Sequence, residues 1–285
     1  MAVVSEARTP RGATERVPPH AWFVVSAVFH YLGPAFAVLL FARVAPLGVA
    51  WLRIATAALV FALWRRPWRL VGRRDLLAWG AVLAGMNCCF YLAIDRLPLG
   101  TVAAIEFLPV VALAALGART RRNAAALALS VAGVAALCDV RLGGEPLGVA
   151  LAFANAALFG LYIVLGHRVA QDAGVDGLGA AMLLAAVAVT PVAGWAAVPA
   201  LSDPVALVAG AGVGIASSVV PYVCDQLAMA RLPRASYALM VALLPATAAV
   251  IGVLVLGQVP TAGEAAGVAL VIGGVALHRE LPDRG

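Results

Sequence analysis

Long apolar runs that follow one another almost without interruption constrain this chain more than any other feature. Of its 285 residues, 64% are hydrophobic and 12% are charged, whereas a soluble domain carries about 25% charged residues. A helix of roughly 20 apolar residues crosses a lipid bilayer. Because several runs approach that length, a single membrane anchor is excluded. The composition therefore predicts a protein embedded in a lipid bilayer.

Ten of these runs are candidates for membrane-spanning helices, so the expected fold class is an all-α membrane protein with ten transmembrane helices. Glycine and proline inside the runs do not exclude helices, since neighbouring helices satisfy the backbone groups that proline frees. The fifth and tenth runs are short. The predicted spans are 22–42, 46–64, 76–94, 100–117, 124–138, 147–166, 178–198, 205–229, 235–256 and 263–277.

The basic residues predict the direction of these spans. All 20 are arginines, and most of them precede the first span or follow an even-numbered one. The odd-numbered loops hold only Arg43, Arg96 and Arg141. Because arginine-rich loops stay in the cytoplasm, both termini are predicted to be cytoplasmic. We expect residues 1–20 to be a disordered tail and residues 279–285 a second tail, and we read the net charge of +6 as loop charge, not as a nucleic-acid footprint.

An internal repeat divides the predicted spans into two sets of five. AIDRLPLG at 93–100 is similar to AMARLPRA at 228–235, and ALSVAGVAAL at 128–137 is similar to ALVIGGVAL at 269–277. An odd number of spans per repeat makes the second repeat enter the membrane from the opposite side. The expected domains are residues 21–142 and 143–278, related as inverted-topology repeats, an architecture of secondary transporters with a site near the membrane midplane.

Four segments carry a resemblance to a known family: WLRIATAALVF at 51–61, the stretch 91–116 with LPLG and EFLP, FGLYIVLGHR at 159–168, and residues 221–258. They resemble the EamA family of the drug/metabolite transporter superfamily, and within it the threonine/homoserine exporter branch. The resemblance implies a bacterial-type inner-membrane exporter of small metabolites, such as threonine or homoserine, that works by alternating access. The alternative is a broad-specificity exporter of drugs or other metabolites.

Two positions depart from the family pattern. Many members of the family carry a glutamate just before the proline of the second repeat, where this chain has LLP at 243–245. They also often read LGE where this chain has LGQ, ending at Gln258. The two repeats are therefore not expected to supply two symmetric charged sites.

Glu106 is the strongest candidate for a functional residue, because it lies alone in an apolar run. An ionised group at the centre of a membrane helix costs about 2.5 to 3.5 kcal/mol on insertion scales. One hypothesis is that Glu106 binds the ammonium group of a substrate or carries a coupling proton. The other is that it is a protonated acid, hydrogen-bonded between helices.

Asp225 and Arg53 are two further charged candidates within the predicted spans. Asp225 is either a relay residue or an interfacial ion-pair partner of Arg231 and Arg234. Arg53 lies about one and a half to two helical turns into the second span. It either offers a bidentate fork to a substrate carboxylate or snorkels outward, and we slightly favour snorkelling.

Further polar residues within the spans are expected to line a cavity or to bond between helices. They are His30, Tyr31, Asn87, Tyr91, Asn155 and Tyr162. Prolines within or beside the spans are expected to form gates or kinks. They are Pro98, Pro109, Pro221, Pro233 and Pro245.

Other classes of function find little support in the sequence. A membrane enzyme needs paired acids, a metal cluster or a serine and histidine brought together, and no spacing joins Ser217 and Ser218 to His30. No nucleotide-binding P-loop occurs, and the four cysteines lack a metal-ligand spacing, so no cofactor or metal is expected. The expected partners are a small-molecule substrate and the bilayer. The pair Gly263 and Gly267 would permit a homodimer.

Overall fold

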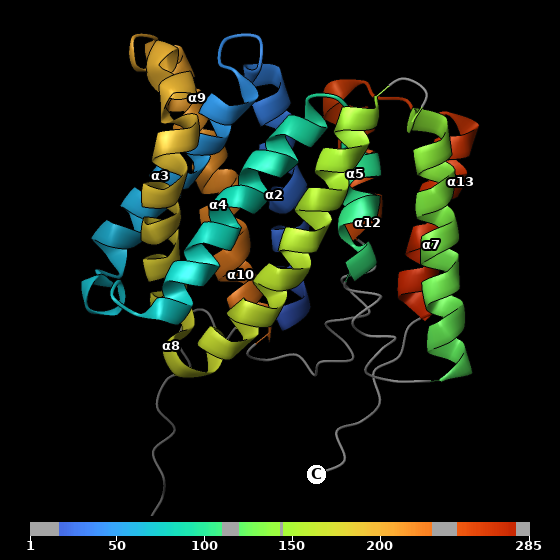
Figure 1. The fold of residues 1–285 in the computed structure, drawn as a ribbon, viewed down its shortest axis with the longest axis horizontal. Coiled ribbons are helices and arrows are strands. Elements are labelled where there is room, and N and C mark those ends of the chain that lie inside the picture. The colour runs from blue at the N-terminus through green and yellow to red at the C-terminus, as the bar shows by residue number, and fades with distance from the viewer. Residues whose placement is uncertain (1–16, 110–119, 143–144, 230–243, 278–285) are drawn as a thin grey trace, which may run out of the picture.

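Helices make up all the regular structure of the described chain. The computed structural model describes residues 17–109, 120–142, 145–229 and 244–277, and no strand occurs within these ranges. The all-α fold class is therefore confirmed for this part of the protein. The elements are α2 (Pro19–Leu40), α3 (Pro46–Trp64), the 3-10 turn η1 (Trp68–Leu70), α4 (Arg74–Ile94), α5 (Leu99–Glu106), α7 (Arg121–Leu142), α8 (Pro146–Leu201), α9 (Pro204–Gly214), the π-helical turn η2 (Ile215–Val219), α10 (Val220–Met229), α12 (Leu244–Leu256) and α13 (Ala262–Leu277) (Figure 1).

Prolines set the beginnings of many of these helices. α2, α3, α8 and α9 each have a proline at the start of the first turn, where a helix has no use for the missing N–H. Pro98 stands just before α5 as its N-cap residue. Pro98 thus begins a helix and does not kink one, and its expected role in a gate stays a prediction.

A break at Gly174 divides α8 into two arms. Gly174 has φ 49° and ψ −133°, values foreign to a helix, and glycine reaches a positive φ without the steric penalty of a side chain. The apolar stretches of the two arms, Pro146–Gly166 and Ala173–Leu201, overlap the sixth and seventh predicted spans.

Six helical stretches are long and apolar enough to cross a membrane, and Leu244–Leu256 and Ala262–Gly274 are shorter apolar helices. Each predicted span overlaps a helix, but residues 110–117 of the fourth and 235–243 of the ninth lie outside the described residues. The multi-pass membrane architecture is supported, and the count of ten crossings stays a prediction. The six stretches are His20–Leu40, Pro46–Trp64, Arg74–Ile94, Pro146–Gly166, Ala173–Leu201 and Pro204–Asp225.

Some predicted boundaries shift in the structure. α2 begins at Pro19, so the last two residues of the predicted tail 1–20 are helical. The fifth span, expected to be short, belongs to the 22-residue helix α7. Apolar pattern alone missed the turns at both ends of α7 because Arg121, Arg122 and Arg141 occupy them.

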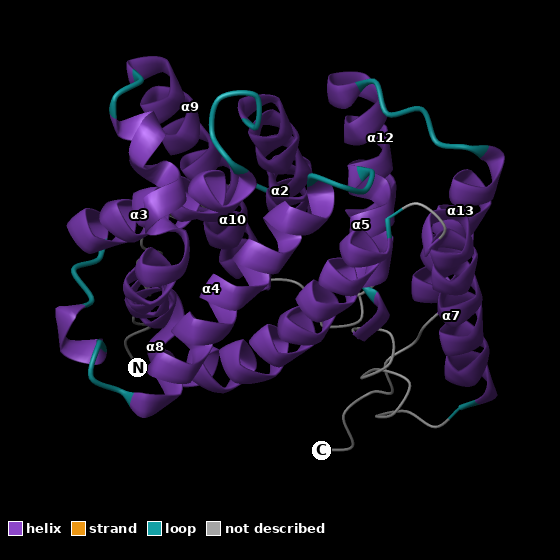
Figure 2. Ribbon diagram, turned by 45° about the horizontal axis from the view of Figure 1, so that its top comes forward, coloured by secondary structure: helices purple, strands orange, loops and turns teal. Residues whose placement is uncertain are grey.

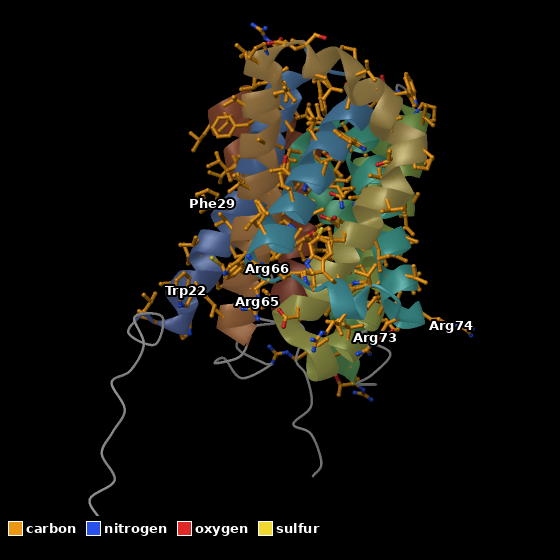
Figure 3. The ribbon with its side chains drawn as sticks, turned by 90° about the vertical axis from the view of Figure 1, so that its left-hand side faces the viewer. Trp22, Phe29, Arg65, Arg66, Arg73 and Arg74 are labelled. Carbon is orange, nitrogen blue, oxygen red and sulfur yellow. The ribbon has the colours of Figure 1, made fainter. Side chains whose placement is uncertain are left out.

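Contacts between the loops show that α3 and the second arm of α8 run in opposite directions. The loop after α2 meets the loop before α9 through Arg43 and Asp203, whose side chains are 3.0 Å apart. At the other end, Arg65 after α3 pairs with Asp176 near the break in α8 at 2.6 Å. Figure 3 shows Arg65, Arg66, Arg73 and Arg74 gathered toward the end of the molecule that holds Trp22, a residue near the start of α2.

The core lies among α2, α3, α4, α5, α8, α12 and the run from α9 to α10. Residues of α7 and α13 extend it at one flank, where these two helices pack on each other. Figures 1 and 2 both show α7 and α13 side by side, far from α3 and α9. Large apolar side chains face outward, including Leu63, Val187 and Trp195. An apolar exterior with polar groups buried inside is the arrangement expected in a bilayer.

Candidate functional site

A buried carboxylate and a buried amide meet between α5 and α8. Glu106, the last residue of α5, is 5% exposed, and Asn155 on the first arm of α8 is fully buried. The Asn155 Nδ2 donates a hydrogen bond of 3.0 Å to Glu106 Oε1. Glu106 therefore faces the interior of the bundle and bonds between helices, an arrangement that suits either of the two roles expected for it.

Arg53 is a second buried charge, and its position corrects the expectation that it snorkels outward. Its side chain lies in the core from the middle of α3, and the residue is 5% exposed. The guanidinium donates from Nε to Ser218 Oγ at 2.8 Å and from Nη2 to the Ser217 carbonyl at 2.9 Å. Partners inside the bundle hold the guanidinium, so it does not reach toward the membrane surface.

The partner of Arg53 is an irregular turn of helix. Residues Ile215–Val219 form a π-helical turn, in which Val220 N–H bonds the carbonyl of Ile215 five residues before it. Pro221 has no N–H to offer the carbonyl of Ser217, four residues earlier. That carbonyl accepts from Arg53. π-Helical turns are rare in proteins, and those that occur are frequently found at functional sites. The turn Ile215–Val219 ends two residues before Pro221.

Aromatic rings connect the remaining candidates from four helices. Tyr162 stacks on Tyr222 with ring centroids 6.3 Å apart, Tyr222 lies 6.2 Å from His30, and His30 lies 5.5 Å from Tyr31. The Arg53 guanidinium stands 5.6 Å from the centre of the Tyr91 ring. The structure thus brings together residues of α2, α3, α4, α8 and α10.

Arg53 and Glu106 act electrostatically on the same group of side chains. Both lie close enough to interact with the Tyr222 hydroxyl, and they interact with each other. Arg53 also acts on His30, and Glu106 on Tyr31. A positive and a negative charge are therefore buried within one region, which we call the polar cluster. It comprises His30, Tyr31, Arg53, Asn87, Tyr91, Glu106, Asn155, Tyr162, Ser217, Ser218 and Tyr222.

Several buried polar atoms of the polar cluster have no hydrogen-bond partner among the described residues. Asn87 donates its Nδ2 to the Leu83 carbonyl of its own helix at 2.8 Å, and its Oδ1 has no partner. The Tyr31 hydroxyl and Asn155 Oδ1 are likewise buried without one. Buried polar atoms are nearly always satisfied in folded proteins. Such atoms are donors and acceptors that a polar ligand would satisfy.

Asp225 and the prolines are only partly brought into the polar cluster. Asp225 is half-buried on α10 and interacts electrostatically with Tyr222, one turn before it. Its expected partners Arg231 and Arg234, like Pro233, lie outside the described residues. Pro109 lies against the first arm of α8, where a side chain at Gly160 would stand 3.0 Å from it. Pro245 is buried at the start of the described part of α12.

Sequence reasoning missed Tyr222 and assigned no role to Ser217 and Ser218. The two serines were weighed as partners of His30 in a membrane enzyme and set aside, and the structure shows that both accept hydrogen bonds from Arg53. The repeat offers a signal for Tyr222, since the offset of 135 between Pro98 and Pro233 pairs Tyr222 with Asn87. Nothing in the sequence indicated that Ser218 meets Arg53, 165 residues away.

A hydrogen bond at the Arg43 end of the bundle joins α5 to the connection between α12 and α13. Gln258 Oε1 accepts from the Leu99 N–H at 3.1 Å, one of the N–H groups that a helix start leaves unpaired. Gln258 is one of the two positions at which the sequence was expected to depart from the family pattern, and its amide oxygen supplies the acceptor. It fixes the start of the helix that ends at Glu106.

An apolar groove of about 550 Å³ lies between α5, α7 and the first arm of α8. None of its lining residues belongs to the polar cluster. Val131 and Phe153 on its walls are exposed on the outside of the bundle. The groove is lined by Leu108, Val131, Val134, Ala135, Pro146, Val149, Ala150 and Phe153.

Comparison with known proteins identifies the family. The EamA-like transporter family matches residues 146–279. The threonine/homoserine exporter RhtA of Salmonella typhimurium (strain SL1344) is 31% identical over 263 residues, which cover 88% of this chain and 88% of the exporter. The chain belongs to the EamA-like transporter family. RhtA of Escherichia coli (strain K12) is 32% identical over 236 residues, 80% of each chain.

A solved crystal structure shares the fold of this EamA-like transporter. The two superpose with a TM-score of 0.61 over 90% of this chain and 96% of the other, at 20% sequence identity. This likeness concerns the fold alone. The family assignment places the polar cluster of Arg53 and Glu106 inside a transport protein. The matched residues 146–279 overlap the second predicted repeat, and the division into two repeats stays a prediction.

Proposed function

We propose that this EamA-like transporter exports small zwitterionic amino acids, such as threonine or homoserine, and binds them at the polar cluster. The observation that carries the proposal is the burial of Arg53 and Glu106 within electrostatic reach of each other, inside a bundle related to threonine/homoserine exporters. A zwitterion presents one charge of each sign. The two buried residues supply the opposite signs.

Each end of the amino acid has a matching group in the polar cluster. The Arg53 guanidinium is a planar donor that fits a carboxylate with two parallel hydrogen bonds. Glu106, held by Asn155 at 3.0 Å, accepts from an ammonium group. The free oxygens of Asn87 and Asn155 and the Tyr31 hydroxyl offer hydrogen bonds to a substrate hydroxyl.

The transport cycle we propose is alternating access between two inverted repeats of five spans. Helix packing supports it, because helices at equivalent places in the two repeats contact each other: α3 packs on the second arm of α8, α5 on α12, and α7 on α13. Ion pairs join the repeats at both ends, between Arg43 and Asp203 and between Arg65 and Asp176. These pairs must open in turn. We place both termini in the cytoplasm of a bacterial-type inner membrane.

Ligand titrations of the purified transporter test the two charged poles. The unfolding temperature in detergent is followed with threonine, with its amino alcohol, which lacks the carboxylate, and with the hydroxy acid that lacks the amine. A ligand that binds the folded state raises the unfolding temperature. Glu106→Gln should lower the affinity for the two ligands that carry an amine by about 10- to 100-fold. Arg53→Lys should lower the affinity for the two ligands that carry a carboxylate by the same factor.

The ligands whose affinity each variant loses show which charged end of the amino acid that residue binds. If Glu106→Gln lowered the affinity for the hydroxy acid as strongly as the affinity for threonine, Glu106 would not be the residue that binds the ammonium group. If the native protein responded to none of the three ligands but did respond to larger apolar cations, the broad-specificity exporter would be the better description. The stacked rings of Tyr162 and Tyr222 are the feature that favours this second function.

A further inference from the structure

The two oxygens that hold Arg53 occupy the positions of a carboxylate. Nε and Nη2 lie on the same edge of the guanidinium, the edge that a carboxylate approaches with its two oxygens. In this structure Ser218 Oγ accepts from Nε at 2.8 Å and the Ser217 carbonyl accepts from Nη2 at 2.9 Å. The fork proposed to bind substrate is therefore filled by two neutral oxygens of the protein.

The local backbone presents these oxygens side by side. The π-helical turn Ile215–Val219 contains Ser217 and Ser218, and Pro221 leaves the Ser217 carbonyl without its usual helical donor. Glycines let the neighbouring helices approach. A side chain at Gly214 would stand 2.9 Å from the Arg53 carbonyl, and one at Gly33 of α2 would overlap Ser217. Both serines are at most 1% exposed.

A carboxylate is the stronger partner for this fork. Hydrogen bonds between a charged donor and a charged acceptor are roughly twice as strong as neutral ones, and Arg53 stays protonated at any physiological pH. Hydroxyl and carbonyl oxygens therefore satisfy the guanidinium while no substrate is bound, yet they do not outcompete an arriving carboxylate.

We propose that Ser218 Oγ and the Ser217 carbonyl are placeholder ligands of Arg53, which the substrate carboxylate displaces on binding. The inference rests on the proposed function, in which Arg53 binds the carboxylate. Ser218 is then a positioning residue that lowers the affinity for every substrate with a carboxylate. Because Arg53 belongs to α3 and the serines to the run between α9 and α10, the exchange also releases one contact between the predicted repeats.

Substitution of Ser218 tests the placeholder role. Ser218→Ala removes one competing acceptor, and Ser218→Cys keeps the size of the side chain but replaces the hydroxyl with a weaker acceptor. Half-saturating concentrations are measured by unfolding-temperature titration with threonine, its amino alcohol and its hydroxy acid. Ser218→Ala should lower the values for threonine and for the hydroxy acid about 2- to 10-fold, with Ser218→Cys in between, and leave the amino alcohol unchanged.

Ser130→Ala is the matched control, since Ser130 is also a fully buried serine but lies on α7, outside the polar cluster. It should change none of the three values. Equal values for native and Ser218→Ala protein would overturn the inference, and so would a shift shared by the amino alcohol, which would indicate a general loosening of the site.

Failure of the proposed function would give a different set of ligand responses from failure of the placeholder role. If the native protein responds to the hydroxy acid but not to threonine, the amino-acid substrate is wrong while the placeholder role is still measured with the hydroxy acid. If it responds to no carboxylate, both proposals fall. If the native protein binds threonine and the Ser218 variants bind it with the same half-saturating concentrations, the placeholder role is overturned and the proposed function stands.

Discussion

Arg53 and Glu106 show why single residues decide the chemistry of this chain. Among the described residues, the buried charged side chains are Arg53, Glu106 and Glu264. Glu264 caps the start of α13 through Thr261, whose N–H donates to Glu264 Oε2 at 2.9 Å. It therefore has a structural role. Arg53 and Glu106 lie deep in the bundle, where a charge costs about 2.5 to 3.5 kcal/mol on insertion scales.

The hydrogen bond between Asn155 and Glu106 should appear as an energetic coupling. We expect Asn155→Ala, Glu106→Ala and the double variant, followed by thermal unfolding in detergent, to give a coupling of about 1.5 to 3 kcal/mol, the usual range for a hydrogen bond to a charged group. Effects of the single variants that simply added would mean that the two side chains do not support each other.

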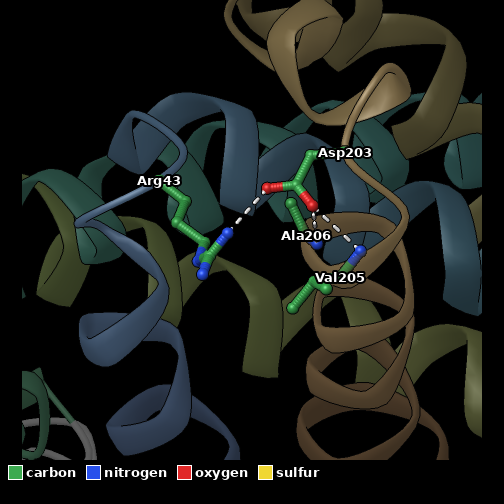
Figure 4. A network of polar contacts seen from close by, with 4 residues as sticks. All are labelled: Arg43, Asp203, Val205 and Ala206. Atoms are coloured by element: carbon green, nitrogen blue, oxygen red, sulfur yellow. Dashed lines mark hydrogen bonds and ion pairs between the residues drawn. The ribbon is translucent and has the colours of Figure 1, made fainter.

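At the scale of the helices, the connection between α2 and α3 is tied to the start of α9 (Figure 4). Asp203 Oδ1 accepts from the N–H groups of Val205 at 2.9 Å and Ala206 at 3.2 Å, while Oδ2 pairs with Arg43 at 3.0 Å. The Ala206 N–H, followed by Arg43, holds the pKa of the Asp203 carboxyl below its usual value. One carboxylate thus caps α9 and joins two loops.

Two variants separate these functions of Asp203. Asn caps helices well, so Asp203→Asn should keep the cap and lose the charge pair, whereas Asp203→Ala should lose both. At neutral pH the unfolding temperature should fall in the order native, Asn, Ala. Because the folded-state pKa is depressed, the charge contribution is complete above the usual carboxyl pKa and is lost as the pH falls toward the depressed value. The gap between native and Asn should therefore close in acid. A gap of constant size would contradict the account.

Two adjacent glycines of α13 make a second test at this scale. A side chain at Gly274 would stand 2.6 Å from the Ala126 carbonyl of α7, while one at Gly273 would meet nothing within 4 Å. Gly274→Ala should therefore destabilise the pair of α7 and α13 by about 1 to 3 kcal/mol. Gly273→Ala is the control, with little change expected. Equal unfolding temperatures for the two variants would show that α7 and α13 do not pack as described.

At the scale of the whole molecule, hydropathy predicted where helices lie, because the bilayer permits little else that spans it. It also predicted that Glu106 lies within a membrane-spanning segment. Hydropathy did not predict that the Arg53 side chain is buried. The energy of a buried guanidinium depends on partners far along the chain, and Ser217 is 164 residues away. The π-helical turn escaped prediction for the same reason. Its irregular hydrogen bonding becomes favourable once Arg53 and Ser26 bond to it and to Pro221.

The central claim is transport of a zwitterionic amino acid through the region of Glu106, and flux measurement tests it most directly. Liposomes containing the purified protein are loaded with labelled threonine or homoserine, and efflux is followed with and without a pH gradient for native protein and Glu106→Gln. The account predicts efflux by native protein that Glu106→Gln abolishes while the variant remains folded. Flux of no amino acid, or equal flux through both proteins, would contradict it.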